Sequence, residues 1–318
     1  MNTPADFSPH LQTLLNGTSP LPHLGVIQAQ GEDAANFLHN QLSNDVLLLP
    51  VGQSRLAAFC SAKGRMQASF ILVKTAPDTV LLVLSLDLLA QTLKRLSMFV
   101  LRAKVKISDI TSQCQLRGLL GASVQALAGD AAPWQTLAQD GVYTVSLYPA
   151  VLGASEIPRA LWIAPSGHAL PAGADVPAQV WQWAEVMSGV TLVSQPVFEA
   201  FVPQMLNYES VGGVNFKKGC YPGQEVVARS QFRGTLKRRT ALVHSLVALT
   251  AGQDVFTPTD PDQACATVVL SAARADGQGF DALVSGTTES MQSGWRVGGA
   301  DGAALDLLPL PYPLLADI

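Results

Sequence analysis

The sequence is poor in charge and has no long apolar run. Only 14% of its 318 residues are charged, whereas 48% are hydrophobic, enough for a large buried core. No apolar run approaches the roughly 18 residues that a membrane-spanning helix needs. The apolar run 80–84 is interrupted by Ser85 and Asp87, so it predicts a buried strand. Met1–Leu15 has neither a basic start nor a sustained apolar segment, which argues against a secretory signal. We expect a cytoplasmic protein without a membrane partner.

Cysteine is also scarce. The four cysteines, Cys60, Cys114, Cys220 and Cys265, lie far apart and form no C-x-x-C pair. This spacing predicts neither a zinc site nor a local redox dithiol, and we expect no bound metal. A large core does not need disulfides, so none are expected. Three of the cysteines lie in apolar, strand-like runs and are expected to be buried, inert thiols; Cys220 is the exception.

Several common catalytic and nucleotide-binding patterns are absent. The sequence has no G-x-G-x-x-G and no Walker loop, and its five histidines show no metal-ligand or triad spacing. Asp45, which follows Asn44, is as consistent with a turn as with a general base. The histidines are His10, His23, His39, His168 and His244. The sequence therefore does not indicate chemistry by the protein's own general bases.

The order of expected elements is that of an α+β protein. Residues 24–29 predict a strand, 32–42 a helix, 56–60, 67–74 and 79–84 three strands, 88–99 a helix and 104–110 a strand. A sparser round follows, with strands at 114–120, 143–148 and 159–164 and helices at 123–128 and 180–187. This order differs from the regular alternation of a parallel sheet. These two successive sets of strands and helices predict an internal structural repeat without sequence identity.

The character of the chain changes near Leu236. Short apolar runs at 240–244, 266–270 and 282–285 are separated by Gly, Asp and Pro clusters. This pattern is typical of a small antiparallel β-barrel. We therefore expect three parts: a first α+β half at 1–110, a second at 111–235 and a barrel at 236–318.

One segment concentrates unusual chemistry around Cys220. Lys217 and Lys218 precede the cysteine, and Pro222 suits the first turn of a helix through Gln224–Arg229. A helix N-terminus and two ammonium groups both favour a thiolate over a thiol. The segment therefore predicts a reactive thiol at Cys220. The alternative is a structural turn that requires Gly219 and Gly223 for positive φ.

The same region is basic in an acidic protein. Between Lys217 and Arg239 there are seven basic residues and one acidic residue, a net charge of +6, whereas the whole chain has a net charge of −4. The basic residues are Lys217, Lys218, Arg229, Arg233, Lys237, Arg238 and Arg239. Such an island indicates an anionic ligand or partner, either a carboxylate-rich cofactor or a nucleic-acid backbone. A solvated face around a turn is the alternative.

The pattern Lys-Gly-Cys-Tyr-Pro-Gly-Gln-Glu at 218–225 resembles the signature of the YgfZ family. Members of this family are folate-binding proteins that assist iron-sulfur enzymes and are similar in fold to the glycine-cleavage aminomethyltransferases. The resemblance extends to 203–207, 212–218 and 227–229 around the motif. It also includes 31–38 and 41–46 near the N-terminus.

The resemblance implies a folate-binding, aminomethyltransferase-like region of two α/β halves, with the barrel folded back against it around a central opening. It implies tetrahydrofolate or a derivative as cofactor. The expected partners are the iron-sulfur cluster assembly machinery or client iron-sulfur enzymes, with tRNA-modification enzymes also possible. Cys220 is the candidate reactive residue. The expected folate-binding residues are Lys218, Gly219, Tyr221, Gly223, Gln224, Glu225, Arg229, Trp183, Glu185 and Asn207.

The helix at 180–187 raises a choice between core and ligand site. Trp181, Trp183 and Val186 suit either the core or the border of a ligand cavity, with the core favoured. Glu185 is a candidate polar contact to a pterin; a solvated glutamate is the alternative.

The sequence differs from the aminomethyltransferases at the position of an acidic residue that contacts folate. In the aminomethyltransferases a strand after a Gly-rich turn carries an aspartate that contacts the reactive end of folate. The corresponding segment here, 63–70, has Ala68 and Ser69 at the expected positions. Without that carboxylate, aminomethyl transfer is not expected, although pterin binding can survive. The resemblance thus favours a folate-binding accessory protein. A folate-dependent one-carbon transferase and a basic-rimmed RNA-interacting module are the alternatives.

Overall fold

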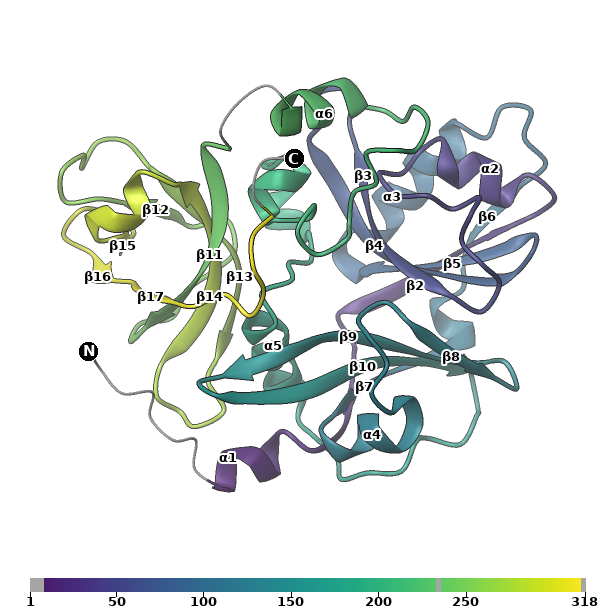
Figure 1. The fold of residues 1–318 in the computed structure, drawn as a ribbon, viewed down its shortest axis with the longest axis horizontal. Helices are drawn as coiled ribbons and strands as arrows, with labels where there is room; N and C mark the ends of the chain where they lie inside the picture. The colour runs from purple at the N-terminus through teal and green to yellow at the C-terminus, as the bar shows by residue number, and fades with distance from the viewer. Residues whose placement is uncertain (1–8, 233–235, 316–318) are drawn as a thin grey trace.

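The computed structural model describes residues 9–232 and 236–315 and contains three antiparallel sheets (Figure 1). Residues 1–8 of the N-terminal segment and Arg233 lie outside the described residues. The chain begins with α1 (Pro9–Leu14). Helices and antiparallel strands are mixed throughout, so the predicted α+β class is confirmed. No helix among the described residues is long and apolar enough to cross a membrane.

The first sheet has five strands with two helices. In spatial order the strands are β3 (Ser54–Cys60), β4 (Met66–Ala76), β5 (Thr79–Ser85), β2 (Leu24–Gln30) and β6 (Lys106–Asp109). The helices are α2 (Ala34–His39) and α3 (Leu86–Met98). β5 is buried along its whole length because alternate side chains face different cores: Leu82 lies in the core under α2 and α3, and Val83 in the core between the sheets.

The helix expected at 32–42 is shorter than predicted. The backbone N–H of Asp33 donates to the Lys104 carbonyl at 3.3 Å, and the Asp33 carboxylate accepts from the Lys104 N–H at 2.7 Å. These long-range bonds hold residue 33 outside the helix, so α2 begins only at Ala34. This contact across 71 residues cannot be read from local periodicity.

The second sheet repeats the first. Its strands, in spatial order, are β1 (Gly17–Pro20), β7 (Cys114–Leu120), β10 (Ser155–Pro165), β9 (Val142–Leu152) and β8 (Thr136–Gln139). Its helices are α4 (Ala122–Ala128) and α5 (Ala178–Met187). The order β7-α4-β8-β9-β10-α5 matches β2-α2-β3-β4-β5-α3 in sequence and in spatial neighbours, so the predicted repeat is confirmed. The edge strand differs: β6 follows its own half, whereas β1 comes from the start of the chain.

A shared core lies between the two sheets. Ile71 and Val83 from the first sheet meet Val145 and Leu161 from the second in one buried cluster, together with Trp181 of α5. α4 covers the opposite face of the second sheet, where Val124 packs on Trp162. The two halves therefore share one core, and any cavity at their interface is lined by both.

The C-terminal sheet is a nearly closed seven-stranded barrel, as predicted (Figure 1). Its spatial order is β16 (Ala303–Ala304), β15 (Arg296–Val297), β12 (Asp254–Phe256), β13 (Ala266–Ala273), β14 (Phe280–Thr287), β11 (Arg238–Ser245) and β17 (Asp306–Leu308). It has its own core around Trp295. α5 lies against β13 and β14 on one side and β9 on the other.

All four cysteines are free thiols. Cys60 is buried inside β3 as expected, and burial raises the pKa of its thiol to about 12. The same expectation was wrong for Cys114 and Cys265, which are only half-buried. Cys114 is the first residue of β7, and Cys265 directly precedes β13, so neither lies deep inside a strand.

Candidate functional site

A cavity lies at the interface of the two five-stranded sheets. Leu56 and Ile71 line it from the first sheet, Tyr148 and Arg159 from the second, and Glu185 from α5. A smaller adjoining cavity shares Ile71 and Glu185 and is also lined by Trp181. We refer to both together as the central cavity. The larger part has a volume of about 30 Å³, room for about one water molecule.

Glu185 is the polar centre of this cavity. Its side chain is 10% exposed, and its carboxylate lies 3.2 Å from Nε2 of His23 and 3.9 Å from Nη2 of Arg159. The Arg159 guanidinium lies over the Trp181 ring at 4.5 Å. A buried carboxylate is thus flanked by two basic groups and an aromatic face, an arrangement that buried charge requires.

Burial and Glu185 act in opposite directions on both basic groups. Burial lowers the pKa of Arg159 to about 10, although the Glu185 charge raises it. Burial also lowers the pKa of His23, but the hydrogen bond and charge of Glu185 outweigh this effect, so the His23 pKa is raised overall. The carboxylate therefore has one cationic partner, Arg159, and one partner whose pKa it raises, His23.

Two buried donors at the cavity have no acceptor. Nε of Arg159 and the indole Nε1 of Trp181 are buried, and no hydrogen-bond partner for them occurs within 9–232 and 236–315. Buried polar groups in folded proteins are nearly always paired. The unpaired donors beside Glu185 therefore mark a place where a polar ligand gains hydrogen bonds.

Aromatic residues form one wall of the cavity. Trp134 lies 5.9 Å from Tyr148 between ring centroids, and Tyr148 lies 5.7 Å from Tyr312. Trp134 has a φ of +70°, a left-handed conformation that costs energy for a residue with a Cβ. Its indole N–H donates to the Val211 carbonyl at 2.8 Å. Trp134 is thus a strained residue of a connecting loop at the edge of the cavity.

The motif around Cys220 lies elsewhere. Residues 217–223, here called the cysteine loop, lead into α6 (Gln224–Phe232), as the sequence predicts. None of the residues 218–225 lines the central cavity. Figure 1 shows α6 beside the first sheet and away from the second. The structure therefore separates the motif from Glu185.

Lys218 points into the protein and not onto a basic rim. Its ammonium donates to the carbonyl oxygens of His39 at 2.7 Å and Leu42 at 2.9 Å, and it lies 4.6 Å from the centroid of the Tyr221 ring. Free carbonyls at a helix C-terminus favour a cation. Burial lowers the pKa of Lys218 to about 8, against the attraction of Asp45 and Cys220. Lys218 thus ties the cysteine loop to the end of α2.

Cys220 is exposed, and two ionisable residues lie beneath its loop. Nδ1 of His39 lies 3.3 Å from the Asp45 carboxylate, and a Cβ at Gly219 would be 3.8 Å from Nε2 of His39. Burial and the Lys218 charge lower the pKa of His39, although Asp45 raises it. Asp45 also accepts from the Leu48 N–H at 2.8 Å, so it is a turn residue as well as a partner of His39.

The two glycines of the motif differ. Gly223 has a φ of +80°, and a Cβ there would lie 2.4 Å from the Ser61 carbonyl oxygen and 2.6 Å from Gly64 Cα. Gly219 is not in the left-handed region, and a Cβ there meets nothing closer than 3.8 Å. The expectation of a turn requiring glycine holds for Gly223 and was wrong for Gly219.

The remaining predicted site residues lie in several places. Trp183 is fully buried at the barrel junction and donates to the Asp281 carboxylate at 2.7 Å. Asn207 is buried with φ +58° and donates to the Thr240 carbonyl at 2.9 Å. Gln224 approaches the Lys218 carbonyl at 3.5 Å, and the exposed Glu225 and Arg229 form an ion pair at 3.2 Å. Of the predicted folate ligands, Glu185 alone lines the central cavity.

The basic island is smaller on the surface than in the sequence. Lys217, Arg229 and Lys237 are exposed, whereas Lys218 and Arg239 are buried. Arg239 forms an ion pair with the buried Glu209. Two of the counted charges are therefore used inside the fold.

Sequence reasoning missed His23, Arg159 and Trp181 as residues beside Glu185. Arg159 begins an otherwise apolar run in β10. Arginine is rarely buried without a partner, so a charged residue in such a run could have indicated a buried polar site. His23 lies in a turn and gave no signal, since its partner Glu185 is distant in sequence.

Comparisons with known proteins agree with this architecture. A family model described as the GCVT N-terminal domain matches residues 17–147. A tRNA-modifying protein YgfZ from Edwardsiella ictaluri is 29% identical over 334 aligned residues, covering 98% of each chain. The protein of the same name from Vibrio vulnificus is 28% identical, covering 93% of this chain and 92% of its own.

The fold is also that of a known enzyme. The crystal structure of glycine cleavage system aminomethyltransferase T from Bartonella henselae superposes with a TM-score of 0.69, covering 96% of this chain and 89% of that one. Sequence identity is 14%, so this likeness concerns the fold alone. The similarity to YgfZ proteins runs through nearly the whole chain, and the GCVT match and the shared fold agree with it. The chain is therefore similar to the YgfZ proteins along its length and has the fold of the aminomethyltransferases.

Proposed function

We propose that this protein binds tetrahydrofolate, or a derivative, in the central cavity and acts in tRNA modification as an accessory factor for iron-sulfur enzymes. The observation that carries the proposal is the buried Glu185 carboxylate beside Arg159, whose guanidinium lies over the Trp181 ring. A pterin presents two adjacent N–H donors on one edge, which match the two oxygens of a carboxylate. Its flat ring system suits the planar guanidinium of Arg159 and the aromatic wall of Trp134 and Tyr148.

The residues present fit such a ligand chemically, but the cavity must open. A volume of about 30 Å³ is well below the roughly 300 Å³ or more of ordinary ligand pockets. Trp134 and Tyr148 form the wall that can move, and Trp134 is already strained. Glu185 would orient the pterin edge, and Arg159 would cover one face. When bound, tetrahydrofolate supplies nitrogen atoms that carry one-carbon units.

The tRNA part of the proposal comes from the names of the two YgfZ relatives. In this proposal the exposed Cys220 faces a client iron-sulfur enzyme or the assembly machinery, because its loop is held on the surface away from the folate. Lys218 and His39 hold the loop from beneath. Folate binding and partner contact would then occur at two separate sites.

The protein should not itself transfer an aminomethyl group. Ala68 is fully buried in β4, and the Ser69 hydroxyl accepts from the Val193 N–H at 3.0 Å, so neither offers an acid. With a glycine-derived aminomethyl donor and tetrahydrofolate, no methylene-tetrahydrofolate should accumulate above the background rate. Turnover that disappears in Asp45→Asn would instead identify a transferase.

A complementation experiment tests the accessory role. Cells lacking this gene would receive the wild type, Cys220→Ser, Glu185→Gln or the control Cys114→Ser, each quantified by immunoblot. The level of modified tRNA and the activity of iron-sulfur enzymes under oxidative stress are the measurements. Cys220→Ser and Glu185→Gln should both fail to restore them at normal protein levels, whereas Cys114→Ser should restore them. Full activity in both site variants would refute the proposal.

A further inference from the structure

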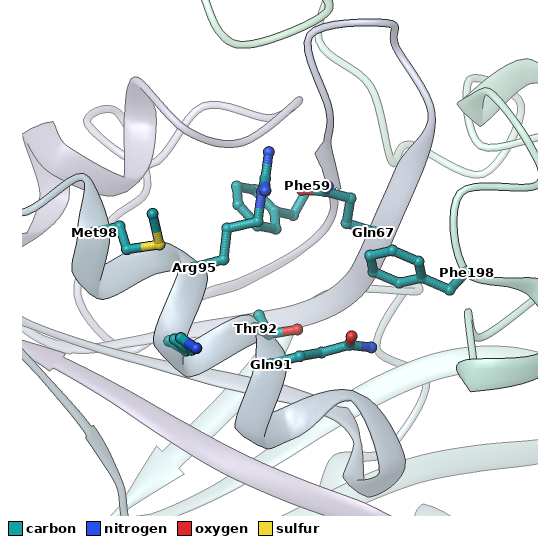
Figure 2. A pocket seen from close by; sticks show the side chains of 8 residues that line it. Phe59, Gln67, Gln91, Thr92, Arg95, Met98 and Phe198 are labelled. Carbon is teal, nitrogen blue, oxygen red and sulfur yellow. The ribbon is translucent and has the colours of Figure 1, made fainter.

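A larger cavity lies apart from both sites described above. Its volume is about 210 Å³, and it lies between α3, the strands β3 and β4 and the segment after the 3-10 helix Gln195–Val197 (Figure 2). In Figure 2, Arg95 and Met98 extend from α3 toward Phe59 and Gln67. None of its lining residues lines the central cavity or belongs to the cysteine loop.

Gln67 presents an unpaired acceptor in this cavity. Its side chain is 3% exposed, and its Nε2 donates to Oε1 of Glu199 at 2.5 Å. Because a carboxylate only accepts, this bond fixes which end of the amide is which. The other end, Oε1, is buried, and no donor for it occurs among the described residues. A buried acceptor without a donor favours a ligand that brings an N–H group.

Glu199 is held in place at the cost of backbone strain. Its φ is +56°, in the left-handed region that residues with a Cβ avoid. Two backbone bonds lock the segment against β4: the Glu199 N–H donates to the Met66 carbonyl at 2.9 Å, and the Met66 N–H donates to the Phe201 carbonyl at 2.7 Å. Strain that the surroundings enforce is typical of binding sites. The orientation of Gln67 is therefore built into the fold.

The rest of the cavity is apolar on one side and basic on the other. Phe59 and Phe198 supply two aromatic rings. Lys94 and Arg95 are exposed on α3, and neither forms an ion pair with a carboxylate in the described part of the chain. A flat ring, an N–H donor and an anionic group in one ligand would satisfy all three features.

We propose that this cavity is a nucleotide-binding site. The base would lie against Phe59 and Phe198, its exocyclic amine would donate to Oε1 of Gln67, and its phosphate would bind Lys94 and Arg95. Aromatic rings bind bases by stacking, and arginine is the preferred phosphate ligand. The same chemistry is offered by a free nucleotide and by an unpaired nucleotide of an RNA. This site goes beyond the proposed folate function, and each can fail without the other.

Calorimetric titration tests the base contact. Adenosine 5′-monophosphate should bind the full-length protein about tenfold more tightly than purine riboside 5′-monophosphate, which lacks the amine. Gln67→Met, which keeps the side-chain length but removes the acceptor, should abolish this preference. No binding of adenosine 5′-monophosphate at millimolar concentration, or an equal preference in Gln67→Met, would overturn the proposal.

An exposed variant tests the phosphate contact without risk to the fold. Arg95→Ala should weaken the binding of adenosine 5′-monophosphate about tenfold and leave the binding of adenosine unchanged. The matched control Arg102→Ala, which is also exposed but lies outside the cavity, should change neither affinity. If both substitutions weakened binding equally, general surface charge would explain the binding, and the proposed site would be contradicted.

The source of the nucleotide is assigned by a third titration. A single-stranded adenosine hexanucleotide that binds more tightly than the mononucleotide, and loses this gain in Arg95→Ala, would identify an RNA site. Equal or weaker binding of the hexanucleotide would identify a free nucleotide as the ligand. Hexanucleotide binding that Arg95→Ala leaves unchanged, with no mononucleotide binding, would overturn the proposal.

Discussion

At the scale of the residue, Lys218 illustrates what sequence leaves undecided. A lysine beside a cysteine suggests surface charge, yet its ammonium is directed at carbonyl oxygens of His39 and Leu42. The direction of a side chain depends on what packs beneath it, and α2 lies nearly 180 positions earlier in the chain. Glu185 was predicted from the sequence and lines the central cavity, whereas His23 and Arg159 required the fold.

The buried ammonium gives a pH-dependent stability. The pKa of Lys218 is about 8 in the folded protein and about 10.4 in an unfolded chain. Between these two pKa values the unfolded state binds more protons than the folded state. The contribution of Lys218 to the free energy of unfolding should therefore rise with pH, by about 0.5 kcal/mol per pH unit after solvent screening. Below pH 8 this contribution is constant.

Chemical denaturation from pH 7.5 to 9.5 measures the effect as the difference between the wild type and Lys218→Met. Groups such as Cys60, whose pKa is raised to about 12, are present in both proteins and cancel. The difference should grow with pH in favour of the wild type. A difference that stays constant over this range would show that the ammonium is solvated and that the loop is not tied to α2.

The four thiols should react in an order set by exposure. Iodoacetamide at neutral pH should modify the exposed Cys220 first, the half-buried Cys114 and Cys265 more slowly, and Cys60 only on unfolding. Mass spectrometry of peptides over time gives the order, and Cys220→Ser should remove the fast phase alone. Early labelling of Cys60 would contradict the packing of β3.

At the scale of the element, the turn between β3 and β4 fits against the start of α6. Gly64 and Gly223 approach so closely that a Cβ on Gly223 would overlap Gly64. The sequence predicted the two strands that flank the turn and the helix after Pro222, because apolar runs and proline are local signals. It could not predict their contact, which joins segments about 160 residues apart.

Gly223→Ala should therefore be much more destabilising than a glycine replacement that costs only backbone strain. Gly277 is the matched control, with φ +73° and nothing within 4 Å of an added Cβ, against φ +80° and a contact at 2.4 Å for Gly223. Gly277→Ala should cost about 1 kcal/mol and Gly223→Ala about 2 kcal/mol more. Equal losses in urea denaturation would mean that the turn and α6 separate easily.

At the scale of the whole molecule, the order of elements was largely predictable because apolar periodicity and turn residues are local. The exchange of edge strands was not: β1 joins the second sheet, although it precedes the first half in sequence. Four residues with little apolar content give no strand signal of their own. The docking of the barrel also depends on a buried polar group, Asp281, which binds His244, Arg274 and Trp183.

Two neighbouring tryptophans test that docking. The Trp183 indole N–H donates to Asp281, whereas the Trp181 indole N–H has no acceptor among the described residues. Trp183→Phe should lower the free energy of unfolding by about 2 kcal/mol more than Trp181→Phe, because it leaves a buried carboxylate short of one donor. Equal losses, measured by urea denaturation, would show that shape alone holds the barrel on α5.

The central claim is that a reduced folate binds at Glu185, and calorimetry under anaerobic conditions tests it most directly. Tetrahydrofolate would be titrated into the wild type, Glu185→Gln and the control Glu156→Gln, an exposed glutamate on β10. Loss of the Glu185 charge in Glu185→Gln should weaken tetrahydrofolate binding at least tenfold. Glu156→Gln and Cys220→Ser should bind tetrahydrofolate as tightly as the wild type. Equal affinity in Glu185→Gln and the wild type would contradict the account and place any folate outside the central cavity.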